Sequence, residues 1–154
     1  MASKTTQVTE GAANPLPPAI VVHGLAHAEA ALAAAAELGV AVTLISAKGA
    51  GGYAGPGWFR AVVEQARAAQ PDVEVTAVLD CGDMPGYALA ALRDGAAIIR
   101  FSGDTAAKIA DIAAQYGARV IAERPEALDL ADVERARRDL GRACREWLEK
   151  HANG

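Results

Sequence analysis

The 154-residue chain is predicted to fold as an α/β domain in which a five-stranded parallel sheet carries helices on both faces. The first observation is a regular alternation of short β-rich segments with longer Ala-rich segments. Because such alternation requires right-handed crossovers, it makes neighbouring strands parallel. The second observation is a unit, present in three copies, in which an Ala-rich helix meets a glycine and passes directly into a strand. A chain of this length can bury one full core, so we expect a single domain over residues 19–154.

The three copies of the helix–glycine–strand unit span residues 30–46, 87–102 and 108–123. In each copy the fourth residue before the glycine is alanine and the third residue after it is β-branched. The glycines are Gly39, Gly95 and Gly117, the alanines Ala35, Ala91 and Ala113, and the β-branched residues Val42, Ile98 and Val120. This pattern is typical of a helix that ends at a left-handed glycine and is followed by a buried parallel strand.

The remaining elements follow from the same alternation. Residues 1–18 are polar, rich in small side chains and close with three prolines, so we expect a disordered N-terminal tail. Strands are predicted at 19–23, 41–46, 74–80, 97–101 and 119–123, and helices at 27–38, 58–69, 87–94, 105–116 and 129–150. The same order of elements also fits half of a (β/α) barrel that closes its sheet by association, because a full barrel needs about 250 residues.

Composition excludes several classes of function. The net charge of −4 and the pI near 5.3 give no attraction to phosphate backbones, so we expect no nucleic-acid partner. No stretch is apolar enough to span a membrane, and residues 1–13 lack the apolar core of a signal peptide. The two cysteines are far apart, which favours a reducing compartment over a disulfide scaffold. We therefore expect a cytoplasmic protein of bacterial type.

Polar side chains gather where the predicted strands end. Parallel strands end at one common edge of a sheet, and that edge is where α/β proteins bind ligands. This set holds an acid, a base, hydroxyls and cations: His23, Ser46, Lys48, Asp80, Asp83, Ser102, Glu123 and Arg124. The edge is thus either a functional site or a set of ordinary polar loops.

The Gly-rich loop 46–57 is the most unusual segment. Gly49 and Gly51 would let the backbone approach a ligand and present N–H groups to an anion. The loop lacks the Gly-Lys-Ser/Thr of a Walker motif, and Pro56 separates it from the next helix. We expect a mobile surface loop or lid here rather than a dinucleotide site.

Four further side chains have both a chemical and a structural interpretation. His23 and His27 are four residues apart, but His23 ends a strand, so we favour capped or solvated histidines over a metal site. Cys81 is interpreted as a small buried residue rather than a nucleophile. Arg100 lies late in an apolar strand, where its charge must be paired, bind an anion or reach the sheet edge.

From its third strand onward the chain resembles a response-regulator receiver domain, which has a flavodoxin-like three-layer fold. Asp80 takes the place of the phosphoacceptor and is followed by Met84-Pro85-Gly86, while Ser102 and Arg124-Pro125 end the next two strands. The family's acidic pair after strand one is replaced by His23-Gly24, and its lysine by Arg124. The resemblance therefore implies an atypical, non-catalytic receiver-like domain.

Three functions follow. The first is a receiver-like interaction or small-ligand-binding module that self-associates or binds a protein partner. The second is a small enzyme acting on a phosphorylated or carboxylated metabolite, with Lys48 and the loop binding the anion, Asp80 or Asp83 as acid/base, and Arg100 or Arg124 stabilising charge. The third is a half-barrel assembly protein. The candidate ligand-binding residues are His23, Lys48, Gly49, Gly51, Asp80, Asp83, Arg100, Ser102 and Arg124. No cofactor, metal or catalytic residue is assigned.

Overall fold

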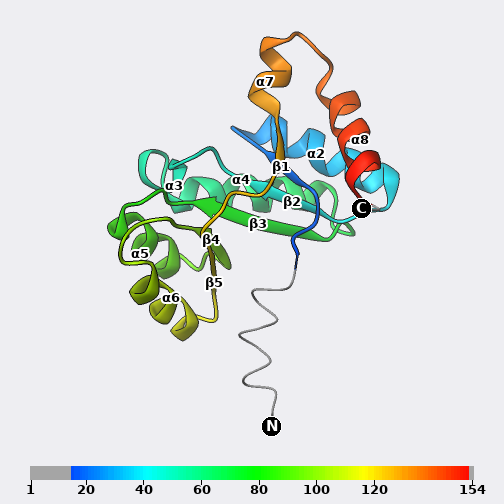
Figure 1. Ribbon diagram of the computed structural model, residues 1–154. Coiled ribbons are helices and arrows are strands. Elements are labelled where there is room, and N and C mark those ends of the chain that lie inside the picture. The colour runs from blue at the N-terminus through cyan, green and yellow to red at the C-terminus, as the bar shows by residue number, and fades with distance from the viewer. Residues whose placement is uncertain (1–14, 153–154) are drawn as a thin grey trace.

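The computed structural model describes residues 15–152, which form an α/β fold around a parallel sheet (Figure 1). The sheet has six strands in the order β5-β4-β3-β2-β1-β6, and every pair of neighbours is parallel. The strands are β1 (Ala19–Val21), β2 (Val42–Ile45), β3 (Val75–Asp80), β4 (Ile98–Arg100), β5 (Arg119–Ile121) and β6 (Ala127–Asp129). The predicted class and the parallel sheet are confirmed, whereas the predicted number of five strands is wrong.

Strand β6 is the one that sequence analysis missed. Its three residues, Ala-Leu-Asp, include no β-branched or aromatic side chain, so propensity gives no signal for a strand. The strand forms because β1 offers a free edge, along which Ala19 pairs with Ala127 and Val21 with Asp129. Tertiary pairing thus determines this element.

The last predicted helix, 129–150, is divided into α7 (Leu130–Arg135) and α8 (Leu140–His151). Arg137 adopts a left-handed conformation with φ of 56°, which interrupts the helical path. Asp139 then accepts a hydrogen bond from the backbone N–H of Arg142 and so caps the start of α8. The segment that was predicted to be one continuous helix therefore forms two short ones.

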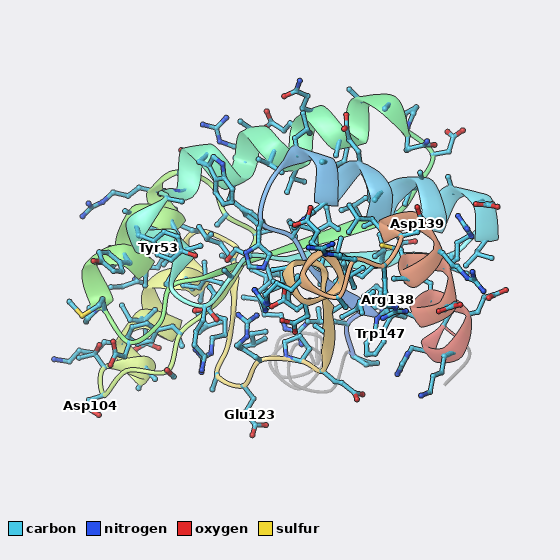
Figure 2. All side chains as sticks on the ribbon, turned by 90° about the horizontal axis from the view of Figure 1, so that it is seen from above. Tyr53, Asp104, Glu123, Arg138, Asp139 and Trp147 are labelled. Atoms are coloured by element: carbon cyan, nitrogen blue, oxygen red, sulfur yellow. The ribbon has the colours of Figure 1, made fainter. Side chains whose placement is uncertain are left out.

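The remaining helices form a continuous layer. They are α2 (Leu25–Leu38), α3 (Ala50–Tyr53), α4 (Pro56–Ala69), α5 (Pro85–Arg93) and α6 (Ala106–Gln115). Packing runs from α8 to α2 and α4, and through the short α3 to α5 and α6. Figure 2 shows this layer as an arc from the yellow-green helix on the left to red α8 on the right. Helix α3 lies inside the loop that was predicted to be irregular.

Helices cover one face of the sheet, and not both faces as predicted. Strand residues alternate between two core clusters, and all the buried helix residues of the core belong to the larger one. The smaller cluster consists of strand residues and Leu16: Ala19, Val21, Ile45 and Val78 at its centre, with Leu16, Ile98, Ile121 and Ala127 around them. The physical reason is the strand order, because β1 to β5 always advance in the same direction and right-handed crossovers then place each helix on the same face.

The repeated unit folds as predicted. Gly39, Gly95 and Gly117 have positive φ angles of 68°, 94° and 72°. In each copy the backbone N–H of the residue after the glycine donates to the carbonyl of the repeated alanine. These bonds join Val40 to Ala35 at 3.1 Å, Ala96 to Ala91 at 3.0 Å and Ala118 to Ala113 at 2.8 Å. The chain therefore turns from helix to strand by one geometry three times.

The predicted tail lies mainly outside the described residues, which begin at position 15. The two residues just before β1 accept hydrogen bonds from β2. Thr43 donates from its Oγ1 to the carbonyl of Pro17 and from its N–H to the carbonyl of Pro18. No helix in the described range 15–152 has the length and apolarity needed to cross a membrane.

Candidate functional site

The register of the sheet places residues from neighbouring strands at one level near the carboxyl edge. Asp80 pairs directly with Arg100, and Ile45 pairs with both Val78 and Val21. Asp80 lies two residues after Val78 within β3, whereas His23 and Ala47 lie two residues after Val21 and Ile45, just beyond the ends of β1 and β2. Because residues two apart in a strand share a face, Asp80 lies with Val78 on the face that carries no helices.

Asp80 is the centre of this edge. The residue is fully buried, and its Oδ1 accepts hydrogen bonds from the backbone N–H groups of Gly49 (2.9 Å) and Gly82 (2.8 Å). Its Oδ2 faces Nη1 of Arg124 at 2.6 Å and Nη1 of Arg100 at 3.4 Å. A buried carboxylate of this kind requires such compensation, since an unpaired charge away from water is costly.

Both arginines are anchored by more than the carboxylate. Arg100 donates from Nε to the carbonyl of Ala122 at 2.9 Å, and Arg124 donates from Nη1 to the carbonyl of Ser46 at 3.3 Å. Their side chains are 14% and 21% exposed, so both arginines are partly accessible to solvent. Two cations share one anion here, which leaves an excess of positive charge in this group of residues.

Ser46 connects the end of β2 to the backbone of Asp80 through its hydroxyl group. Its hydroxyl accepts a hydrogen bond from the backbone N–H of Asp80 at 2.9 Å and donates to the carbonyl of Ala47 at 3.1 Å. Gly51 packs on the other side, where an added Cβ would lie 3.0 Å from the Cys81 Sγ and 3.1 Å from the Asp80 carbonyl oxygen. Glycine at this position lets α3 approach the end of β3 closely.

A second polar group lies beside the first, at the ends of β1 and β6. The His23 Nε2 is 2.7 Å from Oδ1 of Asp129, and that oxygen also accepts the backbone N–H of Ala131 at 2.9 Å as the N-cap of α7. The backbone N–H of His23 donates to Nδ1 of His27 at 3.0 Å, and the His27 Nε2 is 2.9 Å from Oε1 of Glu134. Two carboxylates therefore orient two histidines.

The structure brings together only some of the residues singled out from sequence. Gly49, Asp80, Arg100 and Arg124 form one group, and Gly51 packs against it. Three others, Lys48, Asp83 and Ser102, are exposed. Ser102 enters the hydrogen-bond network through its backbone N–H, which donates to the carbonyl of Gly82 at 2.9 Å.

Sequence analysis missed the partners of both histidines. Asp129 was placed only at the start of a helix, where an N-cap is the usual role of aspartate. Its contact with His23 depends on β6, which the sequence did not reveal. Glu134 has no distinguishing feature in the sequence, yet its carboxylate reaches the buried ring of His27.

The chemistry open to Cys81 is limited by its burial. The residue is fully buried, and this burial, with a smaller effect of the neighbouring Asp80 charge, raises the pKa of its thiol to about 12. The thiol therefore stays protonated at neutral pH and is a poor nucleophile. Among the described residues, no three His, Cys, Asp or Glu side chains are grouped so that they could hold a metal ion.

Comparison with known proteins adds no assignment to this geometry. The chain matches no model of a protein family, and a search of curated proteins finds no relative.

Proposed function

We propose that the protein binds a small anionic ligand, a carboxylate or a phosphate, at the carboxyl edge of its sheet. The observation that carries the proposal is the convergence of Arg100 and Arg124 on the single buried carboxylate of Asp80. Arginine is suited to this role because its planar group binds carboxylate and phosphate in a bidentate manner. The bonds described above use Nε and Nη1 of Arg100 and Nη1 of Arg124, and each guanidinium carries five N–H donors.

Asp80 acts in this proposal as an organiser of the site. Both its carboxylate oxygens accept hydrogen bonds and the side chain is fully buried, which disfavours attack on a phosphoryl donor. These contacts support a role of Asp80 in binding and not in phosphoryl transfer, which is the non-catalytic part of the receiver-like prediction; the strand order does not follow the flavodoxin-like order of that family. The family resemblance itself remains a prediction.

For the architecture, we propose an open (βα) barrel in preference to a three-layer flavodoxin-like sheet. A doubly wound sheet of the flavodoxin type has the order 2-1-3-4-5, with helices on both faces. Here consecutive strands are neighbours and the helices line one face, which supports the barrel-like alternative. Both architectures bind ligands at the carboxyl ends of the strands, so the proposed site does not depend on this choice.

Titration of ¹⁵N-labelled protein with inorganic phosphate and with malonate tests ligand binding. We expect saturable shifts of the Gly49 and Gly82 amides with at least one of these probes. Arg100→Gln should weaken that binding at least tenfold, because a charge-assisted hydrogen bond contributes about 1.5–3 kcal/mol. Arg93→Gln is the matched control, since Arg93 is exposed in the last turn of α5.

Two results would overturn the proposal. One is the absence of saturable shifts at Gly49 and Gly82 with both probes. The other is equal affinity of Arg100→Gln and Arg93→Gln. Non-specific attraction of the anionic probe would depend only on the net charge of the protein. Because both variants lose one positive charge, it would weaken the affinity equally in both.

A second proposal concerns self-association. Strands β5 and β6 are the two ends of the sheet, and each has a hydrogen-bonded neighbour on one side only. Such edges can pair with another chain. We expect multi-angle light scattering to give a dimer or larger species, and a monomer across the micromolar range would exclude the assembly function.

A further inference from the structure

We infer that His23, oriented by Asp129, is a general base that takes a proton from the ligand held at Arg100 and Arg124. The inference rests on the proposed function and extends it from binding to proton transfer. The substrate class is a small carboxylate or phosphate ester with an acidic C–H next to a carbonyl group. Three features of His23 support this role: the tautomer of its ring, the exposure of its side chain and its place at the end of β1.

The tautomer follows from the hydrogen bonds. An ionised aspartate only accepts, so the short contact of 2.7 Å places the His23 proton on Nε2, directed at Oδ1 of Asp129. Asp129 is itself held by the N–H of Ala131 and by its position in β6, opposite Val21. The imidazole is thereby fixed with its lone pair on Nδ1. A carboxylate on one nitrogen that prepares the other as base is a recurring arrangement in acid–base catalysis.

His27 provides an internal contrast. Its Nδ1 accepts the backbone N–H of His23, its Nε2 faces Glu134, and the residue is 6% exposed. Both of its nitrogens are therefore occupied, and it positions the backbone of His23. The His23 side chain is 33% exposed, and the hydrogen bond described for its ring involves Nε2, not Nδ1.

The two polar groups are close enough to act on one small molecule. His23 follows the end of β1 and Asp80 ends β3, and strand β2 alone lies between these two strands. Neighbouring strands lie about 4.8 Å apart, so this separation is roughly 10 Å. The guanidinium of Arg124 lies within this gap, because its Nη1 donates to the carbonyl of Ser46 at the end of β2. A ligand of three or four carbons would reach from the guanidinium groups to the imidazole.

The proposed step is a balanced proton transfer. The Nδ1 lone pair takes the proton, the C–H electron pair forms the C=C bond of an enolate, and the carbonyl π pair moves to oxygen. The arginines stabilise the new negative charge, and Asp129 stabilises the imidazolium. Return of a proton from Nδ1 to the carbon restores the substrate, so in D₂O the enzyme exchanges substrate hydrogen for deuterium without any oxidant or cofactor.

The first test is ¹⁵N NMR of the histidine rings during titration with malonate, which has three carbons, and separately with inorganic phosphate. With malonate we expect the Nε2–H tautomer of His23, and a ring shift at His23 that Arg100→Gln abolishes, with no shift at His27. Malonate-induced shifts at the Gly49 and Gly82 amides with an unmoved His23 ring would overturn this inference and leave the proposed function standing. Absence of all shifts with both probes would overturn both.

The second test follows deuterium uptake into pyruvate and dihydroxyacetone phosphate in D₂O. We expect exchange by the wild type, a loss of at least 100-fold in His23→Gln, and no loss in the control His151→Gln. Exchange at equal rates in both variants, or no exchange of either probe above the protein-free rate, would overturn the inference.

The variant Asp129→Asn tests whether Asp129 orients the His23 ring or only stabilises the fold as the N-cap of α7. An asparagine can still accept from Ala131 but presents an N–H to His23, so the ring should switch to the Nδ1–H tautomer and lose its basic Nδ1. We expect slower exchange with unchanged phosphate binding at Gly49. Retention of the Nε2–H tautomer together with normal exchange would contradict the role of Asp129.

Discussion

At the scale of single residues, Asp80 joins segments that are far apart in the sequence. Its side chain binds the loop after β2 through Gly49, the turn after β3 through Gly82, and the loop after β5 through Arg124. Each of these contacts replaces water that the buried groups have lost. The loops at the carboxyl edge are consequently held by one carboxylate.

We expect Asp80→Ala to lower the free energy of unfolding by about 3–5 kcal/mol, because it leaves buried cations and N–H groups without their acceptor. Urea denaturation measures this change. Asp83→Ala, in the same loop but exposed, is the control and should stay within about 0.5 kcal/mol of the wild type. A loss at Asp80 no larger than at Asp83 would show that the network contributes nothing.

The two thiols give a prediction about pH. Burial raises the pKa of both Cys81 and Cys144 from 9.0 to about 12. Between these values the unfolded chain loses thiol protons that the folded chain keeps, so stability falls as pH rises from 9 to 12 and is unaffected by the thiols below 9. We expect no labelling of the native protein by iodoacetamide at pH 8 and two labels after unfolding. Rapid labelling of a native thiol would contradict this environment.

At the scale of elements, the repeated unit explains why an Ala-rich sequence forms a well-defined fold. The repeated alanines are buried and place their carbonyls where the residue after the glycine can donate. Their small side chains let each helix end close to the sheet. The unit therefore specifies both a helix end and the packing of the strand that follows.

The glycine of the unit is required for its backbone conformation and not for space. A Cβ at Gly39 or Gly117 would meet no atom within 4 Å, yet both have positive φ. We expect Gly39→Ala and Gly117→Ala each to cost about 1–2 kcal/mol. Gly57→Ala, in α4 with open space and no positive φ, should instead be neutral or stabilise the protein. Equal effects in thermal unfolding at all three positions would contradict this explanation.

Elements were predicted well where the signal is local. Periodicity and the glycines located β1 to β5 and the helices before them within a few residues. Strand β6 was not predicted because its residues carry no strand propensity. The break between α7 and α8 was not predicted because a left-handed arginine, here Arg137, has no sequence signature. Both features depend on contacts with distant parts of the chain.

At the scale of the whole molecule, the two ends of the described chain pack together. Helix α8 lies against α2, and β6 lies against β1 (Figure 1). This side-by-side packing places Leu148 of α8, which is fully buried, in the main core. The C-terminal helix is thus part of the same cooperative unit as the first strand.

We expect Leu148→Ala to lower the free energy of unfolding by about 2–5 kcal/mol, because it leaves a cavity in that core. The loss should appear in one transition monitored by both circular dichroism and Trp fluorescence. Glu149→Ala, one residue further along and exposed, is the control. A separate early transition for Leu148→Ala would show that α8 unfolds independently.

The site was predictable in part for the same reason. Asp80 and Arg124 were predictable as polar residues at strand ends, and Arg100 as a charge late in an apolar strand. Their contact with one another depends on the strand order, in which β3, β4 and β5 are neighbours. The contact between His23 and Asp129 required knowing that β6 pairs with β1. The face covered by helices likewise depends on the order of the strands, which no local pattern contains.

The pairing of β6 with β1 also bears on the order of events during folding. Val21 pairs with Ile45, 24 residues further along the chain, whereas His23 meets Asp129 across 106 residues. Closing the longer loop costs about 1 kcal/mol more in chain entropy, so we expect the first five strands to associate before the sixth. A chain arrested at that stage would already hold the Asp80 network but would lack the carboxylate that orients His23. The contact of Asp129 with His23 would then be the last to form. An incompletely folded or damaged chain would bind the proposed anion before His23 is oriented to act as a base.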